Sequence, residues 1–161
     1  MDILWTPWRM SYISSADKIS ECIFCKAFEE PEKYHVVLRS ESSIALLNAY
    51  PYNTAHVMIA PRRHVPDIIF LEDDEILDLV RILKKIIKAI RREYNPQGFN
   101  IGVNIGRIAG AGIESHLHIH VVPRWSGDTN FLPIISGAKT IPEDLETTRR
   151  RIMKALEEDR E

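Results

Sequence analysis

Three histidines at alternate positions, His116, His118 and His120, are the residues of this chain best suited to chemistry. They lie in residues 115–125 (SHLHIHVVPRW), where branched apolar residues fill the gaps, a composition that favours a strand. Successive strand side chains point to opposite faces, so the three imidazoles would share one face while the apolar residues enter a core. An imidazole binds metals and acts as base, acid or nucleophile. The alternative is an exposed strand whose histidines have no chemical role.

Cys22 and Cys25 form a second candidate site, because a two-residue gap lets both thiolates reach one metal ion. The same spacing occurs in thiol-disulfide enzymes, which place it at the start of a helix after a strand, in a βαβ setting. Here a charged, proline-bearing segment follows, residues 26–33, and no βαβ unit is apparent. The pair therefore favours metal over redox chemistry.

Composition limits the classes of function. The chain has 161 residues, 45% of them hydrophobic, which fits one globular domain over residues 1–161. Its 21 basic and 23 acidic residues give a net charge of −2, so no large cationic field is available for nucleic acid, although a small phosphorylated ligand remains possible. No apolar run is long enough to span a membrane. Residues 1–13 lack the pattern of a signal peptide, and we expect a cytoplasmic location.

The pattern of apolar residues predicts an α+β fold. Strands are expected at residues 34–40, 43–49, 55–60 and 98–104 and in the histidine segment, with helices at residues 72–94 and 140–158. The short links between strands imply an antiparallel sheet of about five strands with the helices on one side. Residues 132–161 would form a C-terminal tail and helix.

The two predicted helices have recognisable ends. In the long helix, apolar residues recur at three- and four-residue steps: Ile76, Leu79, Val80, Leu83, Ile86, Ile87 and Ile90. Acidic residues open it, and Asn95-Pro96 ends it. For the final helix, Thr140 and Glu143 fit a capping box.

Residues 1–20 form an N-terminal arm that carries Trp5 and Trp8. Two tryptophans so close together are unsuited to full solvation. We expect the arm to pack on its own domain. The alternative is an arm that crosses to a second subunit or closes over a ligand.

A glycine-rich loop precedes the histidines, with Gly106, Gly110 and Gly112. Glycine lets the backbone approach a ligand and direct N–H groups at phosphate oxygens. An imidazole beside a bound phosphate suggests attack at phosphorus, and we select the central residue, His118, as nucleophile. For this, a hydrogen bond must fix the proton on its other ring nitrogen. His120 and the loop amides would then stabilise charge on the phosphoryl oxygens.

The histidine segment resembles the histidine triad (HIT) family, whose pattern is three histidines alternating with apolar residues. Strand 55–60 followed by Pro61-Arg62-Arg63-His64, the long helix and the 104–112 loop are also similar, so the resemblance covers about residues 20–125. It implies an α+β fold whose sheet continues across a homodimer. It also implies a nucleotide substrate, attacked at its α-phosphate through a nucleotidyl-histidine intermediate.

The resemblance assigns roles to particular residues. His118 would be the nucleophile, with Asn48 near the ribose, and the remaining nucleotide- or phosphate-binding residues would be His120, His56, Asn104, Gly110 and Gly112. Zinc-bearing members of the family imply a closed, structural zinc site made of Cys22, Cys25, His64 and His116. His35 would then be a bystander.

Different features of the sequence resemble different branches of the family. Many members have aspartate where Asn48 stands; asparagine resembles the nucleotidyltransferase-like branches, yet those replace the third histidine by glutamine and this chain keeps His120. Residues 5–10 and 123–131 resemble the bacterial diadenosine tetraphosphate phosphorylase branch, in which phosphate rather than water accepts the nucleotidyl group. Hydrolase and phosphorylase both stay open. A nucleotide-binding regulatory module with little catalysis and a zinc-stabilised interaction protein are the competing hypotheses.

Overall fold

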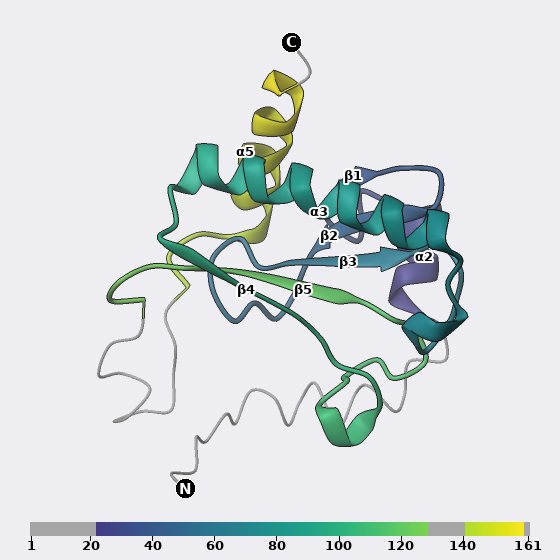
Figure 1. Ribbon diagram of the computed structural model, residues 1–161. Coiled ribbons are helices and arrows are strands. Elements are labelled where there is room, and N and C mark those ends of the chain that lie inside the picture. The colour runs from purple at the N-terminus through teal and green to yellow at the C-terminus, as the bar shows by residue number, and fades with distance from the viewer. Residues whose placement is uncertain (1–21, 129–140, 160–161) are drawn as a thin grey trace, which may run out of the picture.

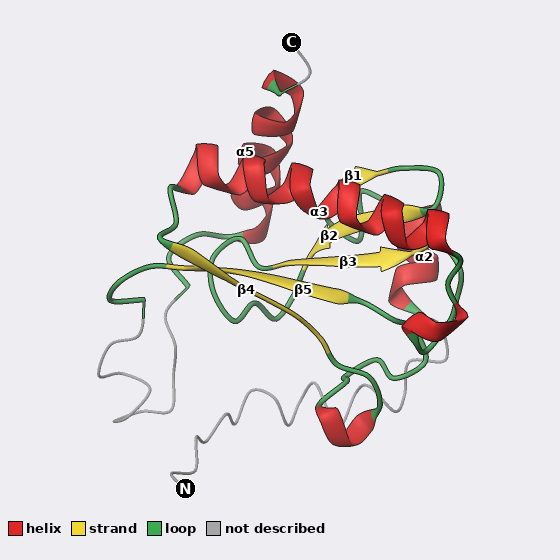
Figure 2. Ribbon diagram, viewed as in Figure 1, coloured by secondary structure: helices red, strands yellow, loops and turns green. Residues whose placement is uncertain are grey.

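The computed structural model describes residues 22–128 and 141–159. The predicted N-terminal arm and residue Thr140 lie outside these ranges. Within them, five strands form one antiparallel sheet in the order β1-β2-β3-β5-β4, which confirms the predicted class (Figures 1 and 2). The strands are β1 (Val36–Arg39), β2 (Ser43–Leu47), β3 (Val57–Pro61), β4 (Gly98–Val103) and β5 (Ile119–Arg124).

Helices lie on both faces of the sheet. The long helix α3 (Asp73–Tyr94) and the C-terminal helix α5 (Leu145–Glu158) pack on one face, with the larger core between them and the strands. The short helix α2 (Ile23–Glu29) packs on the opposite face, below the sheet in Figure 1. The prediction of helices on one side is therefore wrong for α2, whose seven residues are too few for an apolar periodicity to show.

The strand of the histidine segment begins later than predicted. The structure starts β5 at Ile119, with His116 in a bend and His118 in an irregular segment before it. The reason lies in the hydrogen bonds, because the N–H of Leu117 donates to the carbonyl of Val65, 2.7 Å away, instead of joining the ladder between β3 and β5. The first two triad histidines are thus held by the segment that follows β3.

The prediction of a helix over residues 72–94 is confirmed. Glu72 and Glu75 form a reciprocal capping box, and Asn95 ends the helix in the left-handed conformation at φ 44°. Of the apolar residues assigned to the core, Val80 is misplaced: it is 43% exposed, while Ile82 is buried instead. No described helix is both long and apolar enough to cross a membrane.

The C-terminal helix begins five residues after the predicted start. Asp144 is its N-cap, with a side chain that accepts a hydrogen bond from the N–H of Thr147 at 2.9 Å. Glu143 is therefore not the second member of a capping box. Its carboxylate instead accepts hydrogen bonds from the hydroxyl of Tyr94 at the end of α3 and from Arg151 of α5, which joins the two helices.

Replacement of Ile86 by alanine tests the core between α3 and the sheet. Ile86 is fully buried, so Ile86→Ala should lower the free energy of unfolding by about 2–5 kcal/mol in urea denaturation. The matched control is Lys84→Ala, an exposed position of the same helix, where we expect a change within about 0.5 kcal/mol. Equal effects of the two substitutions would contradict this packing.

Candidate active site and metal centre

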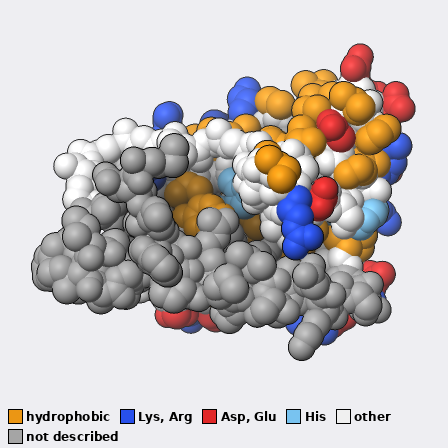
Figure 3. Space-filling model, turned by 90° about the horizontal axis from the view of Figure 1, so that it is seen from below, with side chains coloured by type: hydrophobic (Ala, Val, Ile, Leu, Met, Phe, Trp, Pro, Cys, Tyr) orange, Lys and Arg blue, Asp and Glu red, His pale blue; other side chains and the backbone are white. Residues whose placement is uncertain are grey.

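Neighbouring strands bring the polar side chains of the site to the face of the sheet on which α2 packs. Met58 of β3 packs toward α2 and pairs with His120 of β5. Side chains two residues apart in a strand share a face, so His56, two residues before Met58, lies on the same face as His120. Asn48 follows β2 next to His56, whose carbonyl accepts a hydrogen bond from the Asn48 N–H at 2.9 Å. Figure 3 views the molecule from this side, where histidine atoms reach the surface in a hollow beside apolar side chains.

His118 is held by the backbone of His116. Its Nδ1 lies 2.9 Å from the His116 carbonyl oxygen, and because a carbonyl only accepts, Nδ1 carries the proton and Nε2 keeps a lone pair. Burial lowers the pKa of His118, opposed by the same hydrogen bond, which keeps the ring neutral at neutral pH. The ring packs 5.0 Å from that of Phe24, centroid to centroid. His118 therefore has the protonation state that a nucleophilic imidazole needs.

His56 supports His120 from behind. It is 1% exposed, and its Nε2 lies 3.0 Å from Nδ1 of His120. Its Nδ1 faces the side-chain amide of Asn48 at 3.3 Å and the N–H of Tyr52 at 3.1 Å. Burial, and then its histidine neighbours, lower the pKa of His56 to about 3, so it is neutral at neutral pH. Because both ring nitrogens have partners within the protein, His56 is placed to orient His120 rather than to contact a phosphate itself.

The glycine-rich loop lies next to the histidines. Gly102 pairs with His120 and Val103 with Ile119, so the loop leaves β4 level with His118. The side-chain amide of Asn104 donates to the carbonyl of Gly110 at 3.3 Å, and Gly110 has the positive φ of 92° that favours glycine. The N–H of Gly110 donates to the carbonyl of Arg107.

These bonds mean that Asn104 holds the loop in shape and that the Gly110 N–H is used within the loop. Gly112, two residues further on, is exposed. Of the two glycines assigned to phosphate binding, Gly112 is therefore the better placed to offer its backbone to a ligand.

Two cysteines and two histidines from distant parts of the chain converge on one point. The candidate ligand atoms of Cys22, Cys25, His64 and His116 all lie within 4.8 Å of one another. Nδ1 of His116 is 3.2 Å from Sγ of Cys22 and 3.2 Å from Nδ1 of His64, and Sγ of Cys25 is 3.4 Å from the latter. The other ring nitrogen of His116 donates to the carbonyl of Pro61 at 2.8 Å, which leaves Nδ1 as the ligand atom.

The donor set fits a tetrahedral metal ion. With metal–sulfur and metal–nitrogen bonds of about 2.3 and 2.0 Å, the edges of a tetrahedron are roughly 3.3 Å between nitrogens and roughly 3.5 Å between nitrogen and sulfur. Cys22 is the N-cap of α2, so the motif opens a helix, although no strand precedes it among the described residues. Burial and the neighbouring Cys22 nevertheless raise the pKa of Cys25 to about 11, the reverse of an activated redox thiol. The four residues could bind a metal.

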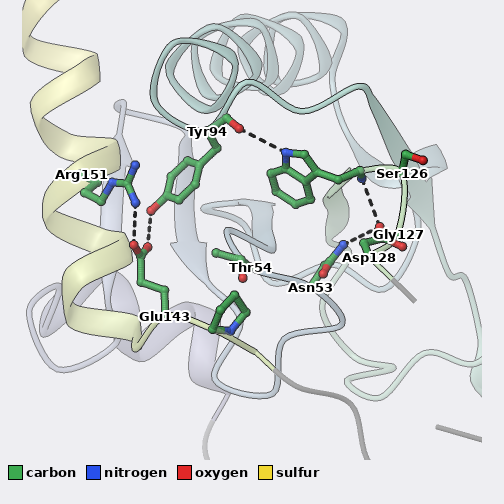
Figure 4. A pocket seen from close by; sticks show the side chains of 10 residues that line it. Asn53, Thr54, Tyr94, Ser126, Gly127, Asp128, Glu143 and Arg151 are labelled. Carbon is green, nitrogen blue, oxygen red and sulfur yellow. Dashed lines mark hydrogen bonds and ion pairs between the residues drawn. The ribbon is translucent and has the colours of Figure 1, made fainter. Parts of the chain in front are cut away.

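A separate pocket of about 520 Å³ lies between the end of α3, the loop after β5 and the start of α5, away from the histidines (Figure 4). Trp125 and Tyr94 line it, and its charged groups are already paired, Arg151 with Glu143 and Asp128 with Arg124. Because these charges neutralise one another, the pocket offers little for a reaction. The groups suited to catalysis are those of the histidine cluster.

Sequence reasoning missed three contributors to the site. Phe24 packs against the rings of both His116 and His118, and its place between the two cysteines was the available signal. The carbonyl of Pro61 and the N–H of Tyr52 orient histidines through the backbone. Residue type gives no indication of such contacts.

Comparison with known proteins identifies the family. The family model described as "HIT domain" matches residues 29–127, and the chain belongs to this family, as its histidine segment suggested. The chain is 43% identical over 156 residues to the AP-4-A phosphorylase of Mycobacterium tuberculosis, covering 91% of this chain and 80% of that protein. It is 28% identical to the adenosine 5'-monophosphoramidase HNT1 of Candida albicans, covering 65% and 71% of the two chains.

A solved structure supports the fold. The crystal structure of a Zn-bound histidine triad family protein from Mycobacterium smegmatis superimposes with a TM-score of 0.71 and 23% identity, covering 87% of this chain and 96% of that one. At this identity the likeness establishes the shared architecture of sheet and helices.

Metal analysis tests whether the four converging residues act together. We expect about one equivalent of a divalent transition metal per purified chain, resistant to dialysis against a weak chelator. His64 is exposed, so His64→Ala should leave the core intact yet weaken retention of the metal by at least about 10²-fold. The control is His35→Asn, which removes a histidine outside the cluster. Loss of metal from both variants, or from neither, would contradict the assignment.

Proposed function

We propose that this protein attacks the α-phosphate of a nucleoside polyphosphate, such as diadenosine tetraphosphate, through a nucleotidyl-histidine intermediate on His118. The observation that carries the proposal is the hydrogen bond from Nδ1 of His118 to the carbonyl of His116. It leaves the lone pair of a neutral ring on Nε2, on the face of the sheet that also holds His120 and the glycine-rich loop.

The reaction then proceeds in two displacements. Nε2 of His118 forms a bond to the α-phosphorus while the bond from phosphorus to the bridging oxygen breaks, and the rest of the polyphosphate leaves with that oxygen. His120, together with the backbone near Gly112, donates hydrogen bonds to the phosphoryl oxygens. Asn48 and Asn104 lie at the ribose and phosphate sides. In the second step an acceptor oxygen attacks phosphorus and the bond to His118 breaks, which restores the neutral ring.

Inorganic phosphate is the acceptor we favour. The support is the 43% identity to the AP-4-A phosphorylase of M. tuberculosis, which extends over 91% of this chain. With diadenosine tetraphosphate as substrate, phosphate as acceptor gives ADP and ATP. Water as acceptor gives AMP and ATP, the outcome for a hydrolase.

Zinc is the metal we propose for the four-residue centre. Two thiolates and two imidazoles in a tetrahedron are typical of structural zinc, because they leave no position open for water. The centre would tie α2 to the segment that carries His116. Its part is to fix the position of His116, while the reaction belongs to His118 and His120 further along the chain.

Replacement of the nucleophile tests the proposed reaction. His118→Ala should reduce turnover of diadenosine tetraphosphate by at least about 10³-fold, because the covalent step is lost, while nucleotide binding persists in calorimetry. His35→Asn serves as the control and should keep activity. Products are identified with and without inorganic phosphate, and ADP formed only in its presence selects the phosphorylase. Tight nucleotide binding with negligible turnover by the unmodified protein would instead support the regulatory module.

A homodimer whose sheet continues through β4 is the assembly we propose. β4 is an edge strand, and Ile101 and Val103 on it are 46% and 39% exposed. An exposed apolar edge offers unpaired backbone groups to a second strand, and a second copy presents the same edge.

Lysine substitutions on that edge test the dimer. Ile101→Lys combined with Val103→Lys should halve the mass measured by light scattering, because charges on the contact face oppose pairing. Ile108→Lys is the control, since it places a charge at an equally apolar and fully exposed residue in the loop after β4. A monomeric unmodified protein, or an unchanged mass in the double variant, would rule out this interface.

A further inference from the structure

The hydrogen bonds around His56 have a fixed direction that starts from the backbone. The N–H of Tyr50 donates to Oδ1 of Asn48 at 2.9 Å, so the Asn48 side chain must turn its amide nitrogen, the donor, toward His56. That nitrogen lies 3.3 Å from Nδ1 of His56, and the N–H of Tyr52 lies 3.1 Å from the same atom. Two donors facing one ring nitrogen require a bare lone pair there.

The donor and acceptor roles at His56 determine those at His120. Because Nδ1 of a neutral His56 bears no proton, its Nε2 does, and that N–H donates to Nδ1 of His120 at 3.0 Å. His120 therefore accepts through Nδ1 and carries its own proton on Nε2. This tautomer is opposite to that of His118, whose Nδ1 is protonated by its bond to the carbonyl of His116.

We infer that Asn48 is a positioning residue that acts through His56 to make His120 a neutral hydrogen-bond donor at Nε2. The His118 and His120 rings lie 4.9 Å apart, centroid to centroid, so a lone pair for attack on phosphorus stands beside an N–H for a phosphoryl oxygen. With the other tautomer, His120 would present a lone pair that repels that oxygen. The direction of the bonds stands on the structure alone, and the use of the N–H for phosphate rests on the proposed function.

The identity of residue 48 decides the direction. Aspartate has the size of asparagine but cannot donate when ionised, so Asn48→Asp calls for a proton on Nδ1 of His56. The stronger, charge-assisted bond would then reverse the chain, leaving a lone pair on Nε2 of His120. Asn48→Ala removes the side-chain donor but keeps the N–H of Tyr52, so it retains the original direction. Both variants lack the asparagine side chain, but we expect them to differ in the tautomers of His56 and His120.

Imidazole ¹⁵N NMR on the histidine-labelled full-length protein at neutral pH measures this directly, with no substrate present. In the unmodified protein and in Asn48→Ala, we expect a pyrrole-type Nε2 and a pyridine-type Nδ1 for both His56 and His120. In Asn48→Asp both patterns should exchange. His120→Gln and His56→Gln assign the signals among the six histidines. A pyridine-type Nε2 on His120 in the unmodified protein would overturn the inference, as would identical tautomers in the two Asn48 variants.

Kinetics then separate this inference from the proposed function. Asn48→Ala should mainly raise KM through the loss of a contact to the nucleotide, whereas Asn48→Asp should also lower kcat by about 10²-fold, the cost of losing one donor to the phosphoryl group. The expected NMR pattern without turnover by any form of the protein would reject the proposed function and keep the tautomer assignment. Equal kcat values for the two variants, combined with exchanged tautomers, would show that the His120 proton has no part in the reaction.

Discussion

His116 is the residue on which the rest of the site depends, because it takes part in both halves of it. Its ring lies between Cys22 and the carbonyl of Pro61, at 3.2 and 2.8 Å. Its own carbonyl accepts a hydrogen bond from the protonated Nδ1 of His118. A shift of this one backbone unit would move a candidate metal ligand and also break the hydrogen bond that fixes the tautomer of His118. The fully buried position of His116, packed against Phe24, makes such a shift costly.

This arrangement explains why a short helix lies on the face of the sheet opposite α3 and α5. α2 has only seven residues, too few to be stable as an isolated helix. Phe24 supplies its apolar contact with the rings of His116 and His118, while Cys22 and Cys25 place their sulfur atoms at the four-residue centre. The helix is thus held by tertiary contacts at the site, and its Phe24 in turn covers the buried ring of His118.

The sequence predicted the parts of the structure that rest on local periodicity. The alternation of histidines indicated a shared face, and the apolar repeat of α3 gave its bounds to within one residue. It failed where distant partners decide. β5 begins at Ile119 because Leu117 bonds to Val65, and α5 begins after Asp144 because the Glu143 carboxylate bonds to Tyr94 of α3 and to Arg151 further along α5.

For the candidate site, too, the sequence predicted some features and left others undetermined. Residue types and spacing were enough to select the four possible metal ligands and the central histidine, once the family pattern was taken into account. The direction of each hydrogen bond was not available, because it depends on backbone groups such as the N–H of Tyr52 and the carbonyl of His116. A protein sequence specifies which side chains are present. The fold decides which of their nitrogens bears a proton.

The histidine rings of the site are buried or half-buried and closely spaced, and both features disfavour their charged forms. Three imidazoles lie close together, with ring centroids 4.9 Å apart for His118 and His120 and 5.2 Å apart for His120 and His56. Burial disfavours any charged ring and is the main cause of the lowered pKa of both His56 and His118, and at His56 repulsion from His120 and His118 adds to it. A cluster kept neutral in this way cannot hold a phosphate by net charge. In the proposed reaction it would do so by the direction of its N–H groups, and this would give residues remote from the phosphorus, such as Asn48, a means to influence the reaction.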